Sequence, residues 1–164
     1  MFLERPVNDN QILNKSRKIT FRVPKKLWLL VQEKAKKEYK GKGKQSKLVN
    51  EALEHFFKNS SVDDINWDNI SSDYILINFL TQIRLGANVK NIGHYPVQAN
   101  ILNSLYDKLN DLEINVRKMK EMLDVRVKPA ILRMSLSQWL YADRNLIRNL
   151  SDVDCPSEDK ITII

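Results

Sequence analysis

The segment from Lys18 to Pro24, with the sequence KITFRVP, alternates strictly between polar and apolar side chains. A period of two predicts a strand that has one face on a core and the other in solvent. Pro24 ends this strand, and its fixed φ suits the first turn of a helix that follows. The apolar face of the strand carries Ile19, Phe21 and Val23, and the polar face carries Lys18, Thr20 and Arg22.

Two helices are expected directly after this strand. The first is predicted from about Lys25 to Glu38, and residues 39–44 then break it because two glycines permit a sharp turn. Ser46 is a suitable N-cap for the second helix. The second helix has a broad apolar face, formed by Leu48, Val49, Ala52, Leu53, Phe56 and Phe57.

This basic module contains one convincing strand, and a lone strand leaves a row of unpaired backbone groups and an uncovered edge. Antiparallel pairing with the same strand of a second chain satisfies those groups. The pattern therefore predicts a homodimer with a two-stranded ribbon that displays Lys18, Thr20 and Arg22 twice. Such a ribbon fits the major groove of DNA, and these side chains are suited to base edges.

The net charge of +7 is concentrated in the first third of the chain. Residues 1–60 carry 15 Lys and Arg against 6 Asp and Glu, which gives +9, whereas residues 61–164 carry 12 against 14, which gives −2. This asymmetry indicates a polyanionic partner for the first third alone. The alternative is a basic face that only increases solubility.

The order of strand, proline, helix, glycine-containing turn and second helix over residues 17–58 resembles the ribbon-helix-helix family of bacterial DNA-binding proteins. The resemblance implies a mostly α-helical, dimeric fold in which Lys18, Thr20 and Arg22 contact bases of double-stranded DNA. It also implies that the start of the second helix holds a phosphate, as the helix dipole favours. The expected phosphate contacts are Lys25, Lys42, Lys44, Ser46 and Lys47.

The rest of the chain is divided by composition into four segments. Residues 1–16 are expected to form a flexible arm, residues 59–72 a linker, residues 73–150 a helical domain for oligomerisation or partner binding, and residues 151–164 a tail. A helix is predicted over residues 74–85, and Pro96 is expected to end or kink it. Another helix is predicted from about residue 130 to 150, separated from its predecessor by Pro129. No repeat of fixed period is apparent.

Between these helices, apolar residues recur at alternating spacings of three and four, which predicts a long helix over about residues 99–125. The repeat is typical both of a helix that packs inside its own domain and of a coiled coil between chains, and the sequence leaves both open. The seam consists of Leu102, Leu105, Leu109, Leu112, Val116, Met119 and Leu123.

The segment RLGANVKNIG, residues 84–93, resembles a motif of plasmid mobilisation proteins of the C type, with Gly86, Asn88 and Ile92 as matching positions. Together with the preceding module, this resemblance implies a relaxosome accessory protein that binds a transfer origin and assists a relaxase in conjugative DNA transfer. Two alternatives remain: a transcriptional repressor whose extension oligomerises, and an antitoxin whose extension binds a toxin.

No residue pattern indicates an enzyme. The two histidines, His55 and His94, and the single cysteine, Cys155, have no spacing typical of a metal site, and no phosphate-binding loop is present. We therefore expect no cofactor and no metal. No apolar run approaches the roughly 18 residues of a membrane helix, and no signal peptide is recognisable, so a cytoplasmic protein without a membrane partner is expected.

Overall fold

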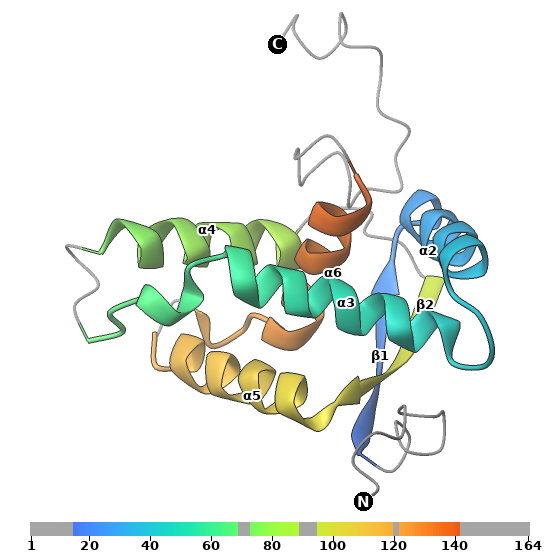
Figure 1. The fold of residues 1–164 in the computed structure, drawn as a ribbon. Coiled ribbons are helices and arrows are strands. Elements are labelled where there is room, and N and C mark those ends of the chain that lie inside the picture. Colours follow the sequence, from blue (N-terminus) through green and yellow to red (C-terminus); the bar gives the residue numbers. More distant parts are fainter. Residues whose placement is uncertain (1–14, 69–72, 89–94, 120–121, 142–164) are drawn as a thin grey trace, which may run out of the picture.

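The computed structural model describes residues 15–68, 73–88, 95–119 and 122–141. The described part is mostly helical and has one two-stranded antiparallel sheet (Figure 1). The elements in chain order are β1 (Ser16–Val23), α2 (Lys25–Glu38), α3 (Lys44–Asn59), the short 3-10 helix η1 (Val62–Asp64), α4 (Tyr74–Asn88), β2 (Tyr95–Leu102), α5 (Asn103–Arg117) and α6 (Val127–Leu140).

The first three elements follow the predicted order of strand, helix, turn and helix. The α2 helix has the predicted bounds, and the turn after it contains Gly41 and Gly43 at φ values of 82° and 72°. Gly43 is the N-cap of α3, so the prediction of Ser46 as the cap is wrong. Because the left-handed φ of Gly43 redirects the chain, α3 begins at Lys44, and Ser46 lies inside its first turn.

The prediction that β1 lacks a partner within its own chain is also wrong. It pairs antiparallel with β2, and the register places Thr20 opposite Gln98, Lys18 opposite Asn100 and Arg22 opposite Pro96. The backbone groups on this edge of β1 are thus satisfied without a second chain. The unpaired edge therefore no longer supports the predicted homodimer.

Pro96 lies in β2, where it does not end or kink α4, which ends at Asn88. The backbone groups of Gln98, Asn100 and Leu102 bond to side chains of α3, on the edge of β2 that faces away from β1. Pro96 is two residues before Gln98, so its backbone nitrogen faces the same way, away from β1. Its missing N–H consequently removes no hydrogen bond from the ladder with β1.

One hydrophobic core runs through the described residues on both sides of the predicted linker. The ribbon lies at one end of the molecule, and α3 and α6 extend behind it in contact with each other (Figure 1). Within the predicted linker, Val62 and Ile65 are themselves buried in this core. The segment 59–72 therefore does not separate two independently packed domains.

The predicted heptad helix is shorter than expected, because Leu102 is the last residue of β2 and α5 ends at Arg117. Five seam positions are buried inside the chain, which corresponds to the predicted packing of a helix within its own domain, whereas Leu123 is 55% exposed. An amphipathic helix of a globular core has the same spacing as a coiled-coil seam. The buried positions are Leu105, Leu109, Leu112, Val116 and Met119.

The last described helix, α6, begins at Val127, three residues before the predicted start. Pro129 lies inside its first turn, where a backbone N–H has no partner in the helix, so it does not separate two helices. The predicted arm, the tail and residues 142–150 of the last helix lie almost wholly outside the described residues. No helix in the described part is long and apolar enough to cross a membrane.

Gly41→Ala is expected to lower the free energy of unfolding by about 1 kcal/mol, because φ at this position is 82° and an L-residue is strained there. A Cβ at Gly41 meets no atom within 4 Å, so no clash adds to this cost. Thermal unfolding measures the change, which should be roughly 2–4 °C for a domain of this size. Lys42→Ala in the same turn is the control, and an equal loss of stability in both variants would contradict the backbone origin.

Candidate nucleic-acid interface

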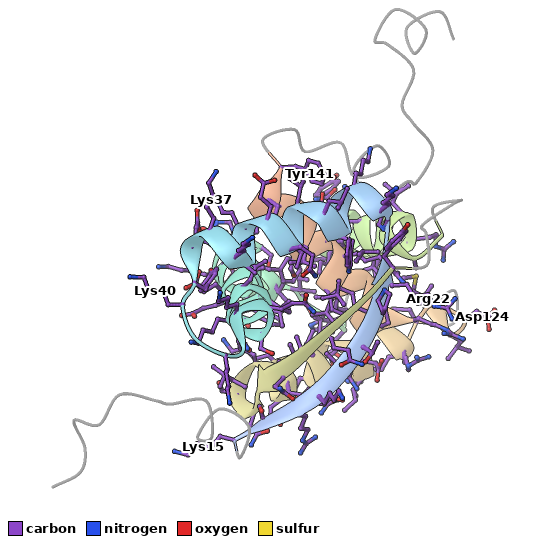
Figure 2. All side chains as sticks on the ribbon, turned by 90° about the vertical axis from the view of Figure 1, so that its right-hand side faces the viewer. Lys15, Arg22, Lys37, Lys40, Asp124 and Tyr141 are labelled. Atoms are coloured by element: carbon purple, nitrogen blue, oxygen red, sulfur yellow. The ribbon has the colours of Figure 1, made fainter. Side chains whose placement is uncertain are left out.

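The outer face of β1 carries the three side chains that the sequence predicted for it. Lys18, Thr20 and Arg22 are exposed, whereas Phe21 and Val23 are buried against the helices. In Figure 2, β1 and β2 cross the lower part of the view below α2, with Arg22 toward one end of β1. The alternation predicted for Lys18 to Pro24 is confirmed, with strand bounds of Ser16–Val23.

The second strand doubles this polar face with residues that the sequence analysis missed. On β2, Pro96 and Gln98 are exposed and Asn100 is partly exposed. The buried face of this strand consists of Val97, Ala99 and Ile101. The same alternation that revealed β1 was thus present here and could have identified β2.

Side chains from the first two turns of α3 hold the free edge of β2. The Ser46 hydroxyl accepts a hydrogen bond of 2.9 Å from the Asn100 N–H. The Asn50 amide donates to the Asn100 carbonyl at 2.9 Å and accepts from the Leu102 N–H at 2.9 Å. Ser46 is buried, and its hydroxyl holds the ribbon. The phosphate contact expected at the backbone amides near Ser46 and Lys47 stays a prediction.

The free edge of β1 is held by Arg133, a residue that the sequence analysis did not identify. Its Nε donates a hydrogen bond of 2.8 Å to the Arg22 carbonyl, and its side chain is only 9% exposed. Burial, together with the charges of Arg126 and Arg22, lowers the pKa of Arg133 to about 10. Arg133 therefore remains protonated at neutral pH and adds positive charge beneath the Arg22 end of the ribbon.

Two lysines of the turn between α2 and α3 and two lysines at the start of α3 lie beside the ribbon. Lys42 is exposed and Lys44 partly exposed, as expected for phosphate contacts, while the ammonium group of Lys47 donates to the Lys40 carbonyl at 3.1 Å. The Tyr39 hydroxyl donates to Glu51, and its burial and this contact raise the pKa of Tyr39 above its usual range. The turn is therefore braced against α3. The fifth expected contact, Lys25, is exposed at the start of α2.

The structure describes only part of the segment that resembles the mobilisation motif. Gly86 and Asn88 belong to the last turn of α4, and Ile92 lies outside the described residues. The α4 helix packs against α6, with Leu76, Phe79 and Ile83 as its buried residues. The relaxosome role implied by the resemblance of residues 84–93 therefore stays a prediction.

The candidate interface thus consists of a polar ribbon that side chains hold at both outer edges, with a basic turn beside it and the buried Arg133 behind it. Among the described residues, no group of three or more His, Cys, Asp or Glu side chains comes together as a metal site would require. Comparisons of the chain with protein-family models, with curated proteins and with solved structures find no match.

Proposed function

We propose that this protein binds double-stranded DNA, with the β1–β2 ribbon in the major groove, as in ribbon-helix-helix proteins. The observation that carries the proposal is the outer face of the ribbon, where polar side chains of both strands lie over a packed core. Two strands about 5 Å apart fit a groove roughly 12 Å wide. The side chains of that face are also chemically suited to base edges, because Arg and Lys pair with guanine and Asn and Gln pair with adenine.

The charges around the ribbon support the same proposal. Lys42 and Lys44 lie at the start of α3, whose N-terminus carries the positive end of the helix dipole. The first turn of α3 contains no acidic residue. Phosphate groups on either side of the groove would meet these charges when the ribbon enters it.

Within this class, we propose a role as a relaxosome accessory protein at a transfer origin, with a relaxase as partner. This finer proposal rests on the resemblance around Gly86 and Asn88. A preferred DNA site beside the nick site of a relaxase would support it, whereas a preferred site overlapping a promoter would favour the repressor alternative.

Binding of the full chain to a random-sequence duplex at several salt concentrations tests the general proposal. The double variant Lys42→Gln and Lys44→Gln is expected to reduce the slope of log affinity against log salt by about 1.8, since each lost phosphate contact contributes about 0.9. Fluorescence anisotropy measures the slope. A wild-type chain that binds no duplex at low salt would overturn the proposal.

Lys58→Gln is the matched control for one lost charge, to be compared with Lys44→Gln. Both lysines lie on α3, but Lys58 is 14 residues further along the helix, about 21 Å from Lys44 at 1.5 Å per residue. The α3 helix runs away from the ribbon from its N-terminal end (Figure 1). Lys58→Gln should therefore leave the salt slope unchanged; equal effects of the two variants would mean that only net charge matters.

A further inference from the structure

The two strands of the ribbon begin two copies of one structural unit within the chain. The order β1–α2–α3 returns as β2–α5–α6, with η1 and α4 inserted between the copies. The N-caps of α2 and α5 are Pro24 and Leu102, which sets an offset of 78 residues for the strands and first helices. In the second helices the offset is 83, which aligns the buried residues Leu48, Val49 and Leu53 with Ile131, Leu132 and Leu136.

The register of the ribbon places a pseudo-two-fold axis at its centre. Thr20 lies opposite Gln98, and Gln98 is also the counterpart of Thr20 at the offset of 78. A residue that faces its own counterpart in an antiparallel pair lies on a two-fold axis. The polar residues on either side obey the same relation, since Arg22 has Asn100 as its counterpart and Asn100 faces Lys18.

Two pairs of tertiary contacts follow this axis. The Trp28 ring lies 5.4 Å from the Tyr95 ring, and the counterpart contact is the Arg17 guanidinium 5.0 Å from the Tyr106 ring. On the outer edges, Asn50 donates to the Asn100 carbonyl, and its counterpart Arg133 donates to the Arg22 carbonyl. These relations join residues of six different elements, so they concern the whole unit and not the strands alone.

The backbone groups at the two outer edges of the ribbon explain why the counterpart of Asn50 is an arginine, Arg133. Asn50 must both donate to the Asn100 carbonyl and accept from the Leu102 N–H. On the other edge, the counterpart of Leu102 is Pro24, which has no N–H. A side chain that only donates, such as that of Arg133, is therefore sufficient there.

The two units differ most on the face proposed to meet DNA. The first strand presents Lys18, Thr20 and Arg22, and the second presents Pro96, Gln98 and Asn100 at the corresponding positions. The turn of the first unit carries Lys40 and Lys42, and Lys44 follows as the first residue of α3, whereas the residues before α6 include Asp124 and Arg126 (Asp124 is labelled in Figure 2, on the side of Arg22). The two units thus share one arrangement of elements but carry different side chains on this face.

We infer that a single chain forms the complete DNA-reading ribbon and binds a non-palindromic duplex made of two unlike half-sites. This inference rests on the proposed function. A homodimer presents the same side chains to both halves of its site and so selects an inverted repeat. Here the two ends of the ribbon differ, because Lys18 and Asn100 lie on one side of the axis and Arg22 and Pro96 on the other. The two halves of the site therefore have different base preferences.

Selection of duplexes from a random library by the full chain, followed by the mass of the complex on the minimal selected site, tests the inference. The expected result is one chain per minimal site and a selected sequence without inverted-repeat symmetry. Two chains on one inverted repeat would overturn the inference and leave the proposed function standing. Failure to bind any duplex would overturn both.

A triple variant with Pro96→Lys, Gln98→Thr and Asn100→Arg gives the second strand the outward side chains of the first. Each end of the ribbon then carries one Lys and one Arg, so the variant is expected to prefer an inverted repeat over the natural site by at least about tenfold, given roughly tenfold per 1.4 kcal/mol of base contacts. Retention of the natural preference by a variant with wild-type thermal unfolding would overturn the inference. If the variant does not fold, the stoichiometry and selection with the wild-type chain still decide.

Discussion

Asn50→Leu is expected to lower the free energy of unfolding by about 3 kcal/mol, the largest effect on stability that we predict for a single side chain. The Asn50 side chain is 8% exposed and makes three hydrogen bonds, of which two hold the edge of β2. Leucine fills a similar volume but leaves the Asn100 carbonyl and the Leu102 N–H without partners. Each unsatisfied buried group costs about 1–3 kcal/mol, and the added apolar burial offsets part of that cost.

The matched control is Asn59→Leu at the other end of the same helix. The Asn59 amide makes the same type of bond to the carbonyl four residues earlier, at 2.9 Å, but its side chain is exposed. This variant should change stability by less than about 0.5 kcal/mol. Chemical denaturation measures both free energies; similar values for the two variants would mean that α3 does not hold the edge of β2.

The parts of the fold that the sequence predicted are those determined by local patterns. The alternation from Lys18 to Pro24 and the glycines of the following turn act within a few residues, so β1, α2 and the turn were predicted closely. The polar face with Lys18, Thr20 and Arg22 followed directly from this alternation. The sequence could not show which strand covers the free edge of β1, because the partner lies about 80 residues away along the chain.

The β2 strand was not predicted because its alternating pattern overlaps the start of the heptad-like repeat. Val97, Ala99 and Ile101 alternate with polar residues, but Leu102 also begins the heptad-like repeat, and Pro96 is uncommon in a strand. Pro96 is tolerated because its backbone nitrogen faces away from β1. The internal symmetry stayed hidden for a related reason: the offset changes from 78 to 83 between the first and second helices, so no fixed period exists.

Buried polar residues were the least predictable part of the candidate site. Arg133 lies in a helix whose residues from Ala130 to Ser137 are all buried, and nothing in its neighbourhood in sequence indicates a bond to a strand 111 residues away. Ser46 was expected at a phosphate through the backbone amides at the start of its helix, which the helix dipole favours. Both residues act on backbone groups of the ribbon, whose positions depend on the tertiary fold.

Arg22→Ala is expected to weaken binding to the selected duplex roughly 5- to 150-fold, which corresponds to about 1–3 kcal/mol for one bidentate contact with guanine. The Arg22 side chain is exposed, and its carbonyl is fixed by Arg133, so the guanidinium extends from a rigid backbone. The loss should be confined to one base-pair position, where the variant accepts other bases. Repeating the selection with the variant and measuring affinities for selected and random duplexes provides the test.

Arg17→Ala separates base reading from charge, because it removes the same side chain from the same strand. The Arg17 guanidinium lies 5.0 Å from the Tyr106 ring of α5, on the opposite face of β1 from Arg22. In the proposed function only the outer face of the ribbon reads bases, so Arg17→Ala should leave the preferred sequence unchanged and weaken binding to selected and random duplexes alike. If Arg22→Ala also weakens both duplexes equally, Arg22 contributes charge alone, and the reading of bases must come from other side chains of the outer face, such as Thr20, Gln98 and Asn100.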